Sequence, residues 1–222
     1  MYYSISRSDD IKEIGYYPQS DLRKGYNPRN NGHFVVKHYE FPDFKPNLEL
    51  EMHPKASPTN YLDSTAGLVN GFVVDRKLKE LLMSFKLPKH HFYPIKVYKQ
   101  EMLLEYYWFH YIIDDFWKFL DKEKSYAEVV FMETPTKIGI EKNVPIYSRE
   151  QIIGEKRKLP RGKKNLRISK IVMKKEFPNY DFYEIDCLSY NTIISEKLRD
   201  SITKASLTGM KIKPFDKFII DE

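Results

Sequence analysis

Two segments of the chain that lie 120 residues apart have similar sequences, and this internal repeat constrains the fold more than any other feature. Residues 72–94 and 192–214 align without a gap, and in each an apolar run ends at a residue able to cap a helix, Asp75 or Ser195. Apolar residues at helical spacing follow, and both copies end at a proline. The identical positions are Lys77/Lys197, Leu78/Leu198, Leu87/Leu207 and Pro94/Pro214. Each copy therefore predicts a strand, a short helix and a second strand.

Strand signals outnumber helix signals in the rest of the chain. Aromatic and β-branched residues fill the run at 106–113, and apolar runs at 127–132 and 166–173 have the length of strands. We therefore expect an α+β fold with a mixed, mostly antiparallel sheet that contains two similar strand–helix–strand units, at about 72–98 and 192–218. Coincidence is the alternative, since any two units with a cap, a helix and a strand share such features.

The first 65 residues differ in composition from the rest. They contain six of the 13 prolines, so a long helix cannot form there. They are also too rich in aromatic residues for a disordered tail. We expect an irregular N-terminal region over 1–65 that packs on the core of an α+β domain over 66–222, the two forming one compact unit.

Several classes of protein are excluded by what the sequence lacks. No window approaches the roughly 18 uncharged apolar residues of a membrane helix. Cys187 is the single cysteine, which excludes an intrachain disulfide and a cysteine metal cage. The first twenty residues lack the basic start and the apolar core of a secretion signal, so we expect a cytoplasmic protein that does not bind a membrane.

No known catalytic motif is present. The six histidines form no His-Glu-x-x-His pattern, and no nucleophile elbow, phosphate loop or dinucleotide-binding glycine motif occurs. We expect His90 and His91 to lie at a strand entry, His110 to be a hydrogen-bonded core or surface residue, and Cys187 to be a buried, inert thiol. The chain is therefore predicted not to be an enzyme, with no catalytic residue, metal or cofactor. An active site assembled from distant residues is the open alternative.

One segment is strongly basic. Residues 154–175 contain ten Lys or Arg and one Glu, a net charge of +9, whereas the whole chain carries +6 and the remainder therefore sums to −3. Pro160 and Gly162 lie within this segment, so we expect residues 155–164 to form the tip of a loop or hairpin. The candidate partner-binding residues are Lys156, Arg157, Lys158, Arg161, Lys163 and Lys164.

Three interpretations of the basic segment are open: a solvated loop, a site for an acidic protein, or a site for nucleic acid. Proteins that bind nucleic acid usually place aromatic residues among the basic ones, and residues 154–175 contain no aromatic residue. This argues against nucleic acid.

The C-terminal part of the chain resembles immunity protein family eleven of bacterial polymorphic toxin systems, formerly a domain of unknown function. The resemblance is carried by a capped helix start at 195–198, a Leu-Thr-Gly at 207–209 and a short strand ending in Ile-Lys-Pro at 212–214. Residues 106–125 and 74–94 are similar to the family's central and upstream segments, although Pro88-Lys89 stands where the second copy has Thr208-Gly209. The resemblance covers about 70–220 and leaves 1–65 unexplained.

The resemblance implies a non-enzymatic immunity protein that binds and neutralises a cognate bacterial toxin domain by occluding its functional surface. No catalytic residue is carried over, because the matching motifs are structural, and the oligomeric state stays open. Because the chain is net positive, we expect the toxin surface that it meets to be neutral or acidic. The alternative function is a nucleic-acid-binding protein that uses the basic segment 154–175.

Overall fold

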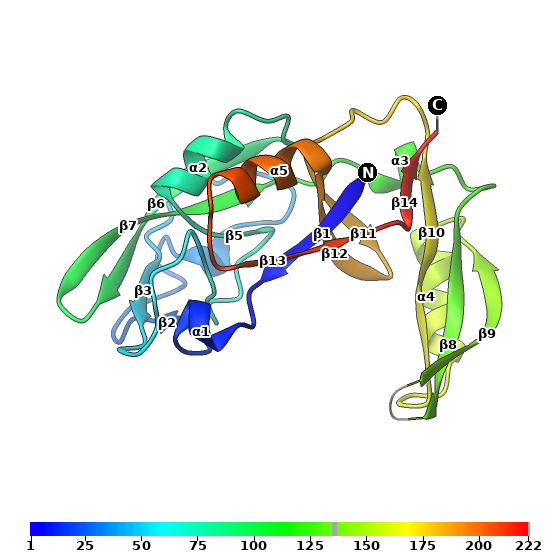
Figure 1. Ribbon diagram of the computed structural model, residues 1–222, viewed down its shortest axis with the longest axis horizontal. Helices are drawn as coiled ribbons and strands as arrows, with labels where there is room; N and C mark the ends of the chain where they lie inside the picture. The colour runs from blue at the N-terminus through cyan, green and yellow to red at the C-terminus, as the bar shows by residue number, and fades with distance from the viewer. Residues whose placement is uncertain (135–136, 222) are drawn as a thin grey trace.

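Three β-sheets and a few short helices make up the computed structural model, which describes residues 1–134 and 137–221 (Figure 1). The largest sheet has the strand order β2-β3-β6-β7-β5-β4. All its neighbouring strands are antiparallel except β3 and β6, which are parallel. Its strands are β2 (Ser20–Leu22), β3 (Glu49–Met52), β4 (Tyr61–Leu62), β5 (Gly71–Asp75), β6 (His90–Lys99) and β7 (Met102–Tyr111).

The other two sheets have four strands each. One has the order β11-β12-β1-β13 and is antiparallel throughout, and the other has the order β14-β10-β8-β9, in which only β14 and β10 are parallel. Their strands are β1 (Tyr2–Arg7), β8 (Tyr126–Thr134), β9 (Lys137–Pro145), β10 (Lys164–Met173), β11 (Phe182–Cys187), β12 (Ser189–Ser195), β13 (Met210–Pro214) and β14 (Phe218–Ile220). The fold is α+β with mostly antiparallel pairing, as the sequence predicts, but its strands are divided among three sheets.

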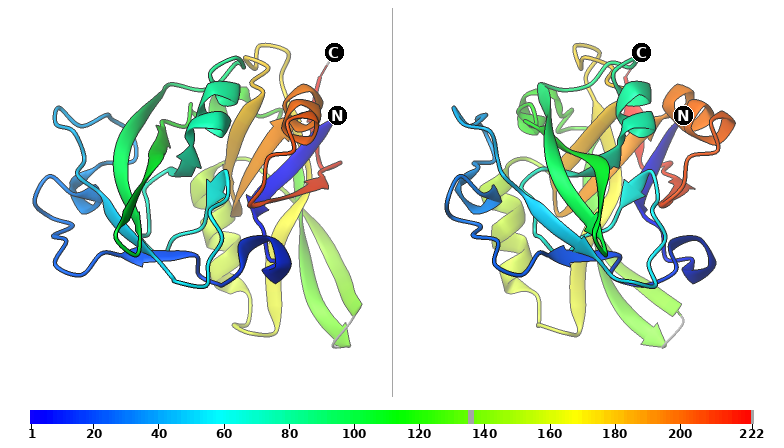
Figure 2. Two further views of the ribbon diagram at one scale, coloured as in Figure 1. Left: turned by 60° about the vertical axis from the view of Figure 1, so that its left-hand side comes forward. Right: turned by 90° about the vertical axis from the view of Figure 1, so that its left-hand side faces the viewer.

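Side-chain caps define where the longer helices begin. The Asp75 carboxylate accepts a hydrogen bond from the Leu78 N–H (2.9 Å), and the Ser195 hydroxyl accepts one from the Leu198 N–H (3.2 Å). Helices α2 and α5 contact each other and lie together above the sheets in Figures 1 and 2. The helices are α1 (Ile11–Ile14), α2 (Arg76–Leu82), α3 (Phe116–Phe119), α4 (Arg149–Lys158) and α5 (Glu196–Lys204), with a 3₁₀ turn at His33–Val35.

The strands that precede and follow α2 lie on the two sides of one antiparallel strand, and the strands that precede and follow α5 do the same in another sheet. β5 and β6 lie on either side of β7, and β12 and β13 lie on either side of β1. The paired residues across the first trio are Val74, Tyr107 and Pro94, and across the second they are Ile194, Tyr3 and Pro214. β1, from the first residues of the chain, therefore completes a sheet whose other strands come from residues 182–214.

The core consists of three clusters of buried apolar side chains. One lies between α2, α5 and the sheets beneath them, where Leu78 and Leu198 are buried. The second lies under the six-stranded sheet and includes Leu48, Leu50 and Met52 from the N-terminal region. The third fills the space between the β8–β10 sheet, α3, α4 and β11. The third cluster fixes α4 on the sheet, and α4 forms one wall of the site described next.

Candidate functional site: a basic groove beside the β8–β9 hairpin

The basic segment begins on helix α4 and continues into strand β10. The Ser148 hydroxyl caps α4 by accepting a hydrogen bond from the Gln151 N–H (3.2 Å). The helix ends at Lys158, because Pro160 cannot continue it, and Gly162 adopts φ = 73° in the turn that leads to β10. The expectation of a loop over 155–164 is therefore wrong in part: residues 155–158 form the last turn of the helix, and only 159–163 form a turn.

The wall opposite α4 is the hairpin of β8 and β9, which presents apolar side chains to solvent. Val130 pairs with Ile140 and Met132 pairs with Ile138, so the four side chains lie on one face of the hairpin. Met132, Ile138 and Ile140 are 67%, 53% and 58% exposed, respectively. On α4, Ile152 is buried in the core, whereas its neighbour Ile153 is largely exposed.

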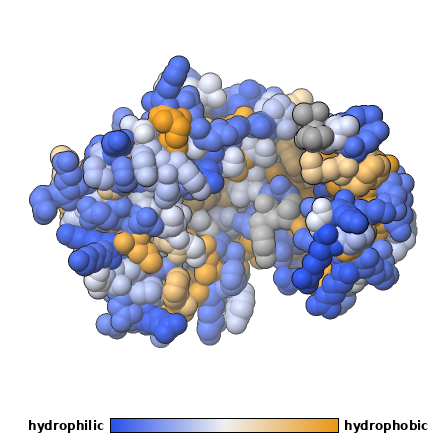
Figure 3. All heavy atoms as spheres, turned by 90° about the horizontal axis from the view of Figure 1, so that it is seen from below, coloured by the Kyte–Doolittle hydropathy of each residue, from blue (hydrophilic) through white to orange (hydrophobic). Residues whose placement is uncertain are grey.

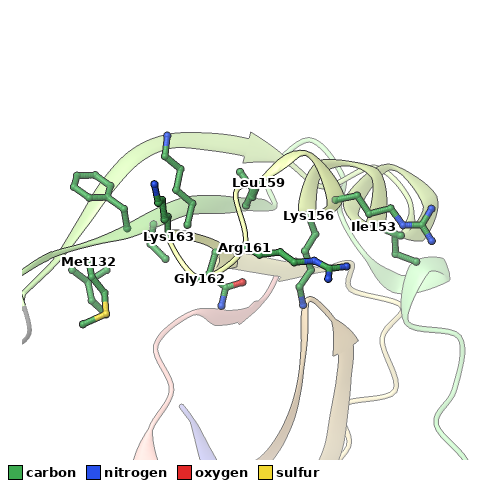
Figure 4. Close-up of a pocket in the computed structure, with 13 residues that line it drawn as sticks. Met132, Ile153, Lys156, Leu159, Arg161, Gly162 and Lys163 are labelled. Carbon is green, nitrogen blue, oxygen red and sulfur yellow. The ribbon is translucent and has the colours of Figure 1, made fainter.

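Between the hairpin and α4 lies a groove of about 760 Å³. Its apolar lining comes from both walls and from the turn after α4, and Figure 4 shows Met132 at one end and Ile153 at the other. Figure 3 shows hydrophobic atoms among hydrophilic ones on the side of the molecule that carries β8, β9 and α4. The apolar residues that line the groove are Val130, Phe131, Met132, Ile138, Ile153 and Leu159.

Five of the six predicted partner-binding residues line this groove. The sixth, Lys158, forms an ion pair with Glu155 (2.6 Å) and does not line it. Lys164 pairs with Glu141 of β9. The other four form no ion pair with any residue that the structure describes, and no acidic residue is among those lining the groove. These four residues, called the groove cations below, are Lys156, Arg157, Arg161 and Lys163.

The groove thus combines positive charges that no acidic residue lining it neutralises with an exposed apolar lining. An exposed apolar surface with a polar rim is typical of a protein interaction site. Unpaired Lys and Arg side chains next to it favour a ligand that brings carboxylates or other anions. The arrangement can hold a negatively charged partner and can desolvate an apolar side chain at its centre.

The histidines and the cysteine lie away from this groove. His90 and His91 open β6, where the His90 Nδ1 donates a hydrogen bond to the Pro88 carbonyl (2.8 Å). Cys187 is buried, and burial raises the pKa of its thiol to about 12, as expected for an inert thiol. Within residues 1–134 and 137–221, no group of three or more His, Cys, Asp or Glu is arranged to hold a metal ion.

His110 fulfils the prediction only in part. Its side chain is fully buried beside Trp108 and Phe41, and neither ring nitrogen forms a hydrogen bond of good geometry with a described residue, although the Lys37 backbone lies close enough to act as a weak partner. Burial, together with the charges of the neighbouring His91 and His38, lowers the pKa of His110 to about 4. His110 therefore lies in the core, one of its two predicted positions, but its hydrogen bonding is weak because mainly aromatic side chains surround the ring.

The sequence identified the cations of the groove but not its apolar walls. Alternate apolar residues at Met132, Ile138 and Ile140 were the available signal, because such alternation is typical of strands. Without the structure, nothing connected that hairpin with the basic residues of α4 and of the turn after it.

No known family model matches this chain. A search of curated proteins also gives no match. The resemblance to the immunity family therefore rests on the residues given above. No helix in the described part of the chain is both long enough and apolar enough to cross a membrane.

Proposed function

We propose that this chain is a non-enzymatic immunity protein that binds a bacterial toxin domain in the cytoplasm and occludes its functional surface. The observation that carries the proposal is the groove: four cations without an acidic partner surround exposed aliphatic side chains. The motifs shared with the immunity family support the same reading of the chain. The contact surface on the toxin would be acidic, with an apolar side chain at its centre.

The chemistry of the groove favours a protein partner over nucleic acid. Its apolar lining is aliphatic except for Phe131, so it offers no row of aromatic rings on which bases could stack. Met132 and Ile138 gain from burial against an apolar side chain, at about 25 cal/mol for each Å² removed from water. Contacts to phosphates alone would leave this surface exposed.

We also infer that the two strand–helix–strand segments, at about 72–98 and 192–218, are structural repeats. In the first segment, Val74 and Pro94 pair with the same residue of the central strand β7, Tyr107. In the second segment, the aligned Ile194 and Pro214 likewise pair with one residue of the central strand β1, Tyr3. These equivalent registers support the inference. The matching caps at Asp75 and Ser195 add to it. Superposition of the two segments in an experimental structure tests this inference.

Toxin neutralisation is tested by a growth assay. Each protein encoded next to this gene is tested as the toxin: it is expressed in a bacterial host with this protein, with a variant that reverses the four groove cations to Glu, or with a control. The control reverses four exposed lysines elsewhere, none of which forms an ion pair with a residue that the structure describes: Lys45, Lys77, Lys122 and Lys197. We expect the wild type and the control to restore growth and the groove variant to fail.

Loss of protection by both reversed proteins, or by neither, would contradict the assignment of the groove. Failure of the wild type to protect would contradict the function itself. Binding of a labelled DNA duplex is measured in parallel across a salt series. Tight binding that falls steeply with salt and is lost in the groove variant would favour the nucleic-acid alternative.

A further inference from the structure

Strand β9 forms an open edge next to the groove. It is the outermost strand of the order β14-β10-β8-β9, and among the described residues it pairs only with β8. It has nine residues, whereas the other strands that end a sheet have two to six. An exposed edge strand offers a row of free N–H and C=O groups to which another chain can pair.

The usual protection of an edge strand covers only parts of β9, as two register shifts with β8, two exposed lysines and a terminal proline. Glu141 is the extra residue where the register with β8 shifts between Val129 and Val130, and it pairs inward with Lys164. Pro145 ends the strand, so it blocks only the last position. All side chains from 137 to 143 are exposed except Gly139, which is half-buried. Residues 137–143 are therefore accessible from the outer side of the sheet.

The open edge and the groove share residues. Ile138 belongs to β9 and lines the groove, and Ile140 lies on the same face of the hairpin. A strand that paired with the outer edge of β9 would place every second side chain on that face. The groove cations line the same groove as Ile138, so acidic side chains on that face of an added strand would meet a positive potential.

We propose that β9 accepts an extended acidic segment of the partner as an additional antiparallel or parallel strand. This proposal rests on the proposed function, because it names the form in which the partner meets β9 at the border of the groove. Main-chain hydrogen bonds to β9 would supply affinity, and acidic and apolar side chains in alternation would supply specificity.

Three occupants could bind at the groove and the edge of β9: a second copy of this chain, an acidic helix or an acidic strand. A second copy of this chain, paired through the same edge, would bring two sets of four unpaired cations together, which is unfavourable. An acidic helix would fill the groove without using the free backbone groups of β9. A strand that alternates acidic and apolar residues offers carboxylates to the cations, apolar side chains to the aliphatic lining, and backbone groups to the open edge of β9.

The probe for this test is a synthetic ten-residue peptide that alternates Glu and Val, capped at both ends. It is titrated into the isotope-labelled full-length protein, and hydrogen exchange is followed at each β9 amide. We expect saturable binding and about fivefold slower exchange at alternate amides between 137 and 144. A Lys-Val peptide of the same length is the charge control and should not bind.

Backbone methylation separates strand addition from side-chain contact. Two further Glu-Val peptides carry N-methyl groups on all Val nitrogens or on all Glu nitrogens, and in each case one side of the peptide backbone loses its donors. At least one of them should bind about tenfold more weakly than the parent. Equal binding of all three, no binding of the parent, or tighter binding of an acidic helical peptide would overturn the proposal.

The two proposals fail separately. If the wild type restores growth, the groove variant does not, and the peptide experiments give the contrary results, only the proposal of strand addition is refuted. If the peptide binds at β9 but the wild type gives no protection against the toxin, the proposed immunity function is refuted, and the proposal that β9 accepts a strand remains.

Discussion

Acidification should destabilise this protein through one histidine. His110 is buried without a hydrogen bond of good geometry, and its pKa falls from the ordinary 6.5 to about 4. Between these values the unfolded chain binds a proton at this position that the folded chain does not. The free energy of unfolding therefore decreases as the pH falls from 6.5 to 4. The shift corresponds to roughly 3 kcal/mol at its full extent, at 1.36 kcal/mol per pKa unit.

The assay is urea unfolding followed by tryptophan fluorescence at several pH values from 7 to 4.5, for wild type and His110→Phe. The buried Glu184 acts in the opposite direction, because burial raises the pKa of its carboxyl group, so the difference between the two proteins is the quantity to compare. We expect the wild type to lose about 2 kcal/mol more than the variant between pH 7 and pH 4.5. Parallel pH profiles would refute the reasoning, whatever the absolute stability of the variant.

Three further outcomes are expected. Leu198→Ala should lower the free energy of unfolding by about 2–5 kcal/mol in urea denaturation, because Leu198 is fully buried; an undiminished midpoint would contradict its place in the core. Reversal of the four groove cations should slow toxin association by about tenfold at low salt in stopped-flow measurements, with the effect fading at high salt; an unchanged rate would point to another surface. His90→Ala, His91→Ala and Cys187→Ala should each leave toxin neutralisation intact in the growth assay, and loss of protection in a folded variant would indicate an undetected site.

The sequence predicted the elements that local chemistry determines. Asp75 and Ser195 mark helix starts because their side chains satisfy free N–H groups of the first turn, a requirement that does not depend on the rest of the fold. The aromatic run at 106–111 became strand β7, and Asp115 caps the short helix that follows.

The sequence did not predict helix α4 or the groove. Most of α4 is charged, and only Ile152 is buried, so its sequence has little of the apolar periodicity that identifies a helix. The groove depends on the packing of α4 against β8 and β9, and this contact between separate segments has no local signature. The division of the strands into three sheets likewise depends on long-range pairing.

The position of β1 between β12 and β13 also affects when the protein can fold. Tyr3 pairs with Ile194 on one side and with Pro214 on the other. At about 5–20 residues per second, a ribosome needs on the order of ten seconds or more to produce β12 after β1. Throughout that time the backbone groups of β1 have no native partner strand, so the nascent chain carries an unpaired β-segment. Contacts between residues so distant in sequence also favour slow folding. Chaperone dependence during synthesis is the expected consequence, even for a chain that is stable once complete.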